Sequence, residues 1–451
     1  MSRSSSLIKR SSKSTLKSRD QLQIRDSKTS TTDSPVHSID GWGLLLDNCA
    51  PNALYASARH EAPRCDEGTR IEVIGKIMSW IKDRDGLSSV LCMTGTAGSG
   101  KSALLQTIAE RYRPGNFSGI LLASFFFSST DSTRNTVERI IPTVAYQLGR
   151  ISPALKQLIN DVVEENPLIF SQSLETQITA LIVDPFKRFQ KYHGMNHIHG
   201  LPYTILIDGL DEAGEEDCQA DLLLAIRQTL LADDLPFRIL ISSRLERAIR
   251  TAIGPGGYLE GRAYHLRLED YDVTEDLHRY LRRRLLVLSL RSGVPPSQWF
   301  NEDDIETLVR SASGKFVYVV TVFKYVSDRR DSPVHKLKEV LARTSRQDAN
   351  SFAALDLLYI KILLEAARDA YSNAGRDFLL LFRLYQVNSV FGLAVKLPVD
   401  ILTAILGLET DGLENLVSYI ATLVTLERDC EGELRLRMSH KTFSDFWGEE
   451  S

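Results

Sequence analysis

The residues with the clearest chemical meaning form a glycine-rich stretch at positions 95–102, which reads GTAGSGKS and matches the pattern GxxxxGK[ST]. Glycines allow the backbone to wrap around phosphate groups and to point N–H groups at them. The stretch follows an apolar run and opens a run of helical periodicity, whose positive dipole end attracts anions. We therefore expect nucleotide-binding contacts from Gly95, Thr96, Ala97, Gly98, Ser99, Gly100, Lys101, Ser102 and Ala103.

Acidic residues follow a second apolar run, residues 203–207. In phosphate-loop enzymes an acid at the end of a neighbouring strand holds Mg²⁺, usually through water. We expect Asp208 to do so together with the Ser102 hydroxyl, while Lys101 reaches the β- and γ-phosphates. One of the next acids orients and deprotonates the attacking water; we favour Glu212 and keep Asp211 as the alternative.

A third apolar run, residues 239–241, ends in Ser242, Ser243 and Arg244. An arginine at this place can reach the γ-phosphate and report whether it is present. A surface arginine at a strand end is the other interpretation, and spacing alone does not decide between them.

The elements that must position these residues alternate between strand and helix. Strand-like runs occur at residues 90–94, 121–127, 203–207, 238–242 and 264–268, and helical patterns lie between them. This alternation predicts an α/β fold, with a parallel sheet covered by helices on both faces. Helical patterns follow at residues 276–288, 305–312 and 316–326. Two short runs near the end, residues 421–427 and 433–438, indicate a hairpin after helices, as in a winged helix.

Composition divides the chain into five expected parts. Residues 1–40 are rich in Ser, Lys and Arg and lack aromatic residues, so we expect a disordered tail. A mitochondrial targeting role for this tail is a minor alternative. The other parts are a helical lead-in at 41–86, the nucleotide-binding core at 87–268, a helical domain at 269–350 and a winged-helix domain at 351–451.

The chain as a whole has the composition of an ordinary globular protein. Of its 451 residues 43% are apolar and 25% are charged, which excludes a wholly disordered or collagen-like chain. The net charge of −4 gives no reason to expect direct nucleic-acid binding. No apolar run is long enough for a transmembrane segment. Five widely spaced cysteines suit reduced thiols in a cytoplasmic protein.

These motifs resemble the NACHT family of signal-transducing P-loop NTPases, of the STAND class, which are NLR-like. The distinguishing mark is the sequence Asp-Gly-Leu-Asp-Glu at 208–212, with a small residue after the first acid. The surrounding sequence is similar to that of a large group of NACHT proteins from filamentous fungi. Their domain is also called nephrocystin-like. The stretches that carry this similarity are residues 62–65 with 68–70, 123–127, 141–148 and 313–318.

The resemblance implies a switch that closes around ADP and opens when ATP replaces it, permitting self-association or association with partner NACHT or effector proteins. It gives Lys101, Ser102, Asp208, Glu212 and Arg244 the roles described above. It also adds His440, which sits where winged-helix histidines of the family contact the β-phosphate of ADP. A histidine buried on an apolar stripe is the alternative. The implied setting is fungal non-self recognition or regulated cell death.

The sequence leaves other functions open. Members of the family usually carry an effector domain in front and repeats behind, and neither is visible in this sequence, so a truncated regulatory paralogue is one expectation. The remaining alternatives are a non-catalytic scaffold that holds nucleotide for structure and an AAA-type motor ATPase. The sequence does not choose between ATP and GTP as the nucleotide, and residues 63–70 are a candidate wall for its base.

Overall fold

The structure is a computed structural model. It describes residues 40–56, 62–84, 86–113, 119–194, 201–231, 235–344, 353–370, 374–390, 399–408, 412–428, 434–438 and 440–449. The tail predicted at residues 1–40 lies outside these ranges except for Asp40. From Asp40 onward the chain forms one compact unit.

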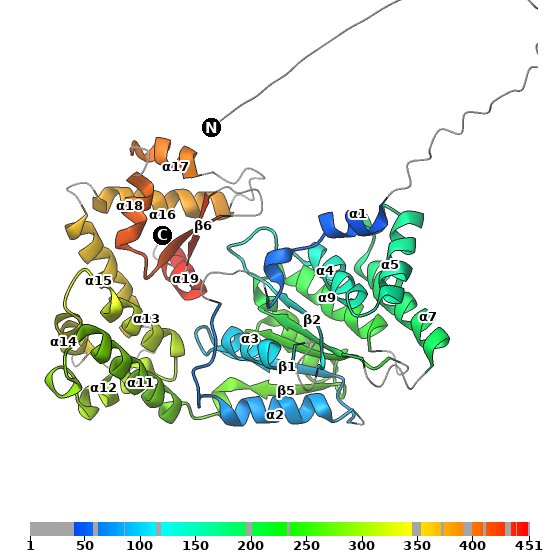
Figure 1. The fold of residues 1–451 in the computed structure, drawn as a ribbon, viewed down its shortest axis with the longest axis horizontal. Coiled ribbons are helices and arrows are strands. Elements are labelled where there is room, and N and C mark those ends of the chain that lie inside the picture. The colour runs from blue at the N-terminus through cyan, green and yellow to red at the C-terminus, as the bar shows by residue number, and fades with distance from the viewer. Residues whose placement is uncertain are drawn as a thin grey trace, which may run out of the picture. The chain divides into compact units, whose positions relative to one another are not determined.

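A five-stranded sheet positions the predicted site. Its strands are β1 (Val90–Thr94), β2 (Leu121–Phe126), β3 (Thr204–Asp208), β4 (Arg238–Ser243) and β5 (Ala263–Arg267). Their order is β2-β3-β4-β1-β5, and every neighbouring pair is parallel (Figure 1). All residues of β1 to β4 are buried. Continuous apolar runs are typical of such strands, because a parallel sheet is covered on both faces.

The five predicted strands are confirmed: β1 has the predicted bounds, and the other four differ by one residue at one end or at both. The clearest difference lies at β3, which extends to Asp208 instead of ending one residue earlier. The reason is a hydrogen bond: the Phe127 N–H donates to the Asp208 carbonyl oxygen at 2.9 Å. Backbone pairing therefore continues past the apolar run, and it fixes the acid at the carboxyl edge of the sheet.

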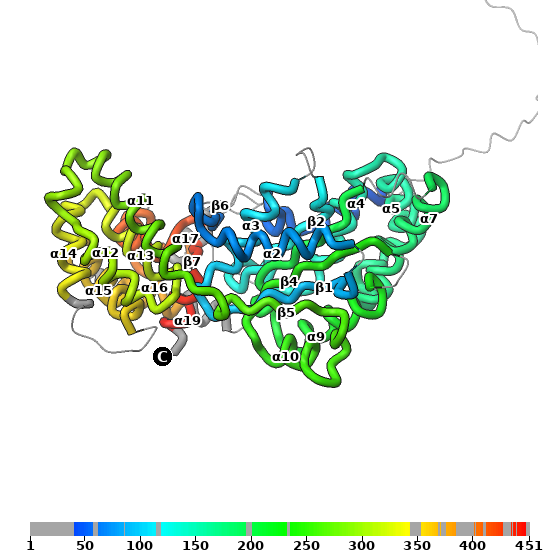
Figure 2. Tube along the Cα trace, turned by 90° about the horizontal axis from the view of Figure 1, so that it is seen from below, coloured from blue at the N-terminus to red at the C-terminus, as the bar shows by residue number. Residues whose placement is uncertain are grey.

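Two helices cover one face of the sheet and a larger group covers the other. Alternate strand residues, such as Leu91 and Met93, pack with α2 (Ile71–Lys82) and α3 (Lys101–Arg111). The intervening residues, such as Val90 and Cys92, pack with the second group. Figure 2 shows α2 on one side of the strands and α9 (Glu216–Thr229) and α10 (Arg247–Ile253) on the other. The second group comprises α1 (Gly41–Asp47), α4 (Ile140–Gly149), α5 (Pro153–Glu165), α6 (Leu174–Ile178), α7 (Asp184–His193), α9 (Glu216–Thr229) and α10 (Arg247–Ile253).

The chain after β5 is helical, as predicted, and ends with a hairpin and one more helix. Its helices are α11 (Thr274–Ser292), α12 (Glu302–Ala312), α13 (Phe316–Ser327), α14 (Pro333–Thr344), α15 (Ala353–Asp369), α16 (Ala374–Val390), α17 (Val399–Leu406), α18 (Gly412–Tyr419) and α19 (Lys441–Glu449). Between α18 and α19, β6 (Val424–Arg428) and β7 (Leu434–Met438) pair antiparallel. These elements share one hydrophobic core.

Among the described residues, every helix is too short or too polar to cross a membrane.

The aromatic side chain of Phe443 joins α19 to that core, and its removal tests the packing. The ring is 1% exposed, and its centroid lies 5.0 Å from the ring of Tyr359 and 5.5 Å from that of Phe382. We expect Phe443→Ala to lower the free energy of unfolding by about 3–5 kcal/mol, because it leaves a cavity. Urea denaturation measures this loss. The control is Leu290→Ala on α11, where the side chain is 85% exposed and the expected change is below about 0.5 kcal/mol.

Candidate functional site

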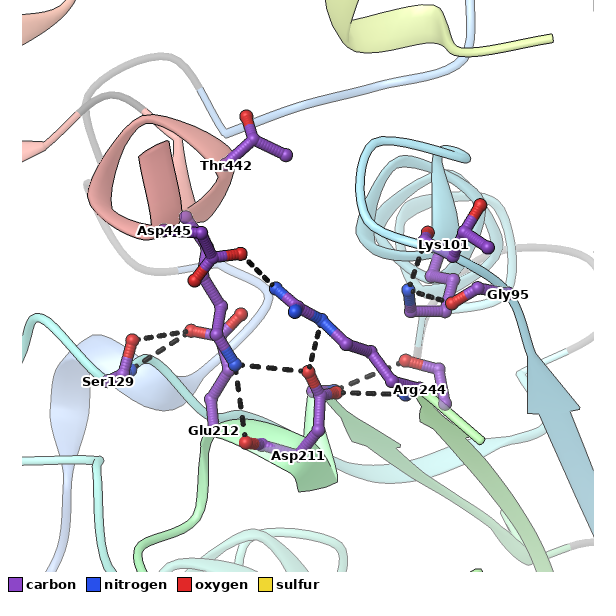
Figure 3. A network of polar contacts seen from close by, with 12 residues as sticks. Gly95, Lys101, Ser129, Asp211, Glu212, Arg244, Thr442 and Asp445 are labelled. Carbon is purple, nitrogen blue, oxygen red and sulfur yellow. Dashed lines mark hydrogen bonds and ion pairs between the residues drawn. The ribbon is translucent and has the colours of Figure 1, made fainter. Parts of the chain in front are cut away.

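The glycine-rich stretch forms a tight loop between β1 and α3. Gly98 and Gly100 have φ angles of 75° and 95°, in the region that glycine adopts without strain. The Lys101 ammonium turns back onto this loop and donates to the carbonyl oxygens of Gly95 and Thr96, at 2.7 and 3.2 Å (Figure 3). Burial lowers the pKa of Lys101, while the charges of Asp211 and Asp208 oppose that shift. The lysine therefore lies near acids and is held by weak neutral acceptors that an anion can displace.

The loop also touches the helical region behind the sheet. The Val317 N–H of α13 donates to the Gly98 carbonyl oxygen at 3.3 Å. A Cβ atom placed on Gly98 would lie 2.3 Å from Cγ1 of Val317. Glycine at position 98 is thus required twice, by its backbone conformation and by the close approach of α13.

The carboxyl edge of the sheet brings Asp208 beside β4. Its carboxylate accepts a hydrogen bond from the Ser242 hydroxyl at 2.5 Å, and the same hydroxyl accepts from the Gly209 N–H at 3.2 Å. Asp208 is only 3% exposed. Sequence reasoning noted Ser242 as part of a polar strand end but did not foresee this bridge, which fixes the orientation of the acid.

Asp211 is the centre of an ion-pair network. Its side chain is 4% exposed, and its Oδ2 lies 3.2 Å from Nε of Arg244 and 3.1 Å from Nζ of Lys441 (Figure 3). Arg244 in turn donates from Nη2 to Asp445 at 2.7 Å. Lys441 and Asp445 both belong to α19. Burial alone raises the pKa of Asp211, but the surrounding cations, with Lys441 the strongest, outweigh burial and hold the pKa below its ordinary value.

Glu212 has a different environment although it is the next residue. Its Oε2 accepts hydrogen bonds from the backbone N–H and the hydroxyl of Ser129, at 3.0 and 3.3 Å. Burial raises the pKa of Glu212, and the Lys441 charge and the Ser129 N–H reduce that rise. A carboxylate with a raised pKa is a better proton acceptor than one surrounded by cations. This contrast distinguishes two acids that the sequence left as alternatives.

A cavity of about 450 Å³ lies where these residues meet the helical region. Its phosphate-loop side includes Gly98, Gly100, Lys101 and Ser102, and its acid side includes Asp211, Glu212 and Arg244. Residues of α13, α15 and α19 complete the wall. Of the predicted nucleotide-binding residues, Ala97, Ala103 and His440 also line the cavity, whereas Gly95, Thr96 and Ser99 are not part of its lining, nor is Asp208.

The other end of the cavity carries polar atoms that the sequence analysis did not assign. Arg70 has a left-handed backbone (φ 57°), and its Nη2 donates to the Ser99 carbonyl oxygen at 2.7 Å. Its Nε and Nη1 are buried and have no hydrogen-bond partner. The same holds for Oδ2 of Asp66. A strained, buried residue with free donors beside a cavity is typical of a binding site. Residues of the segment 63–70, the candidate wall for the base, line the cavity. The positive φ of Arg70 itself cannot be read from a sequence.

The donor set fits a nucleotide with Mg²⁺. Loop N–H groups and Lys101 suit phosphates, and the orphaned atoms of Arg70 and Asp66 suit a polar base or ribose. Among the described residues, no three His, Cys, Asp or Glu side chains gather as a metal site. Mg²⁺ usually takes one or two protein ligands and completes its shell with phosphate and water oxygens.

His440 lies in the cavity wall beside the start of α19. Its Nδ1 accepts a hydrogen bond from the Thr442 N–H at 3.2 Å, which assigns the ring proton to Nε2 in the neutral form. His440 is an exposed residue by its accessible surface, although many protein atoms lie near its ring. Burial and the charges of Lys101 and Lys324 lower the pKa of His440 to about 4. Lys324, on α13, is a further cation of this wall that sequence reasoning missed.

The sheet order and the loop define the class of fold. A parallel sheet in the order 2-3-4-1-5, with a GxxxxGK[ST] loop between its β1 and α3, is the P-loop NTPase fold. Residues 74–244 match the family model described as "Nephrocystin 3, N-terminal". This match spans β1 to β4 and less than half of the chain.

Comparisons with other proteins add little to that match. No curated protein matches the chain. Among solved structures, Drosophila ORC bound to DNA has 12% identity and a TM-score of 0.32, covering 96% of this chain and 95% of that one. Cdc6p from Pyrobaculum aerophilum has 12% identity and a TM-score of 0.34, covering 87% and 97%. A RuvB mutant of Thermotoga maritima has 12% identity and a TM-score of 0.25, covering 85% and 96%. Scores this low carry no argument about this chain.

The pKa of His440 predicts how stability depends on pH. Because the folded-state pKa lies near 4 and the ordinary value is 6.5, the unfolded chain binds the proton more readily. The contribution of neutral His440 to stability is therefore complete above pH 6.5 and is lost as the pH falls toward 4. We expect the urea midpoint of the nucleotide-free protein to fall less between pH 7 and pH 5 in His440→Gln than in the wild type. Equal slopes for the two proteins would contradict this assignment.

Proposed function

We propose that this chain is a NACHT-type NTPase switch, which binds ATP with Mg²⁺, hydrolyses it slowly and couples the bound nucleotide to an open or closed state. The observation that carries the proposal is the pairing of α19 with the site: Lys441 binds Asp211, and Asp445 binds Arg244. Residues expected to work on phosphate are thus engaged by the C-terminal part of the chain. Such an arrangement suits a resting state that ATP must open.

The proposed reaction is in-line attack of water on the γ-phosphorus. Glu212 takes a proton from the water, the new P–O bond forms, and the bond between the γ-phosphorus and the β,γ-bridging oxygen breaks, so ADP leaves with the electron pair. Lys101 and Arg244 stabilise the negative charge that shifts onto the phosphate oxygens. With nucleotide bound, Mg²⁺ held by Ser102 and Asp208 would neutralise charge on the β- and γ-phosphates.

His440 completes the proposal for the closed state. In the neutral form its Nε2–H is a donor in the cavity wall, so it can bind a β-phosphate oxygen of ADP without adding a buried charge. The C-terminal hairpin and α19 would act as a winged helix that clamps the nucleotide. Opening would permit self-association or binding of a partner, and the resemblance to fungal NACHT proteins suggests non-self recognition or cell-death signalling.

Identification of the nucleotide carried by the purified protein tests this function first. We expect about one ADP per chain when the protein is denatured and the released nucleotide is separated by chromatography. Lys101→Ala should abolish this retention, because no other side chain of the loop offers a cation. Retained GDP would show that the bound base is guanine and not adenine, and it would still support the switch proposal. An empty protein with rapid ATP turnover would contradict the switch and favour a motor.

The ion pairs of α19 predict the exchange rate. We expect Lys441→Ala combined with Asp445→Asn to speed release of a fluorescent ADP analogue about 10-fold, since two partly buried ion pairs are lost. Stopped-flow displacement by unlabelled ADP measures the rate. The control is Arg282→Ala, which removes an exposed pair with Glu302 on the helical surface and should leave release unchanged. Unchanged release in the double variant would refute the resting-state interpretation.

Hydrolysis is tested separately by Glu212→Gln. We expect ATP binding to persist and turnover to fall at least about 100-fold, because the amide cannot accept the proton. Radiolabelled ATP retained after gel filtration and phosphate release measure the two properties. If turnover is unchanged while Asp211→Asn abolishes it, the assignment of the base reverts to Asp211. If both variants retain wild-type turnover, neither acid is the base.

A further inference from the structure

The loop that follows β2 is folded around one buried carboxylate. Residues 128–134 close on themselves: the Ser128 N–H donates to the Arg134 carbonyl oxygen, and the Asp131 N–H donates to the Ser128 carbonyl oxygen, each at 3.1 Å. Asp131 is 7% exposed and lies 2.9 Å from Nε of Arg134. Arg134 also donates from Nη1 to the Phe126 carbonyl oxygen at 2.7 Å, which ties the loop to the end of β2. Backbone hydrogen bonds, the Thr133 donors to Asp131 and the ion pair between Asp131 and Arg134 therefore hold the loop together.

One end of this loop holds the acid proposed as general base. Because β2 and β3 are neighbours, the loop after β2 lies beside the residues after β3. Ser129 donates twice, from N–H and hydroxyl, to the same oxygen of Glu212, Oε2. These donors fix the direction of the carboxylate and favour its ionised form. They leave Oε1 as the oxygen to receive a proton from water.

The other side of the loop is held by the C-terminal hairpin. Arg437, on β7, donates from Nη2 to Oδ2 of Asp131 at 2.7 Å, and its side chain is 21% exposed. Asp131 thus binds one arginine of its own loop and one from a strand more than 300 residues later in the chain. Burial alone raises the pKa of Asp131, but Arg134 and Arg437 reverse the shift and bring the pKa to about 2. The carboxylate is ionised at every physiological pH, so the clamp does not depend on titration.

We propose that Arg437 is a positioning residue for hydrolysis, which acts through Asp131 and Ser129 to hold Glu212 in its productive orientation. The inference rests on the proposed NTPase function and deepens it, because it gives the hairpin a role besides closing the cavity. When the hairpin is docked, the loop is clamped and Ser129 faces Glu212. When the hairpin departs, the loop loses one of its two arginines and Glu212 loses its fixed donors. Hydrolysis is then coupled to the contact between β7 and this loop, which is separate from the α19 ion pairs that ATP must open.

Steady-state kinetics and hydrogen exchange on the full chain test the coupling. We expect Arg437→Ala to lower kcat for ATP about 3- to 10-fold with KM unchanged, since Arg437 is not part of the cavity lining. Arg437→Lys should restore part of the loss, because a lysine can still pair with Asp131. Ser129→Ala, which keeps the N–H and removes the hydroxyl, should lower kcat too. In the double variant Arg437→Ala/Ser129→Ala, the fold-decrease in kcat should be smaller than the product of the two single fold-decreases, as expected for residues in one chain of contacts.

Hydrogen exchange separates this inference from the function on which it rests. Amide exchange in a peptide covering residues 128–134 should be about 10-fold faster in Arg437→Ala and unchanged in the control Arg310→Ala, an exposed arginine on α12. Faster exchange in this peptide without any ATP turnover in the wild type would keep the contact but overturn the role in hydrolysis and the proposed catalysis. If Arg437→Ala and Arg310→Ala both hydrolyse ATP with the wild-type kcat and both show wild-type exchange, the inference is overturned but the proposed NTPase function is not. A general rise in exchange across the chain of Arg437→Ala would show that this variant misfolds. The kcat of Arg437→Lys, which is expected to fold, then tests the inference: a kcat below the wild-type value supports it, and an unchanged kcat overturns it.

Discussion

The removal of the Asp211 carboxylate from water is the constraint on which the rest of the site depends. A buried charge of this kind is tolerated only when cations and hydrogen-bond donors surround it. Here the cations are Arg244, from the next strand of the sheet, and Lys441, from the last helix of the chain. Electrostatic pairing at one carboxylate therefore joins the edge of the sheet to residues more than 200 positions away in the sequence. The charges that can serve catalysis also hold the structure together.

This arrangement gives the two adjacent acids different chemical properties without any difference in their side-chain class. Asp211 is stabilised as an anion by ion pairs, whereas Glu212 has mainly hydrogen-bond donors and a raised pKa. The backbone geometry after β3, with a turn at residues 210–212, points one acid at the arginine and lysine and the other at Ser129. Division of labour between neighbouring carboxylates thus follows from where the flanking strands end.

Much of this site could be predicted from the sequence because its parts are local. The phosphate loop is contiguous, and the polar residues after β3 and β4 must meet at the carboxyl edge of a parallel sheet. The bounds of β3 were less predictable because hydrogen bonding to Phe127, and not hydropathy, sets its end. Lys441, Asp445 and Arg437 could not be assigned as partners, because a salt bridge across hundreds of residues leaves no periodic signal. The sequence indicated residues 63–70 as a candidate wall but not the part that Arg70 plays in it, because its left-handed conformation is a tertiary property.

The close approach of Val317 to Gly98 has one more consequence. Any side chain at position 98 must either distort the phosphate loop or push α13 away from it, because the space is already filled by a valine. Position 98 therefore works as a steric gauge of the distance between sheet and helices. A bulkier residue there would force the phosphate loop and α13 apart without changing any charged group. Because a side chain at position 98 would also disfavour the positive φ of the loop, phosphate binding and the distance to α13 are coupled at this one position.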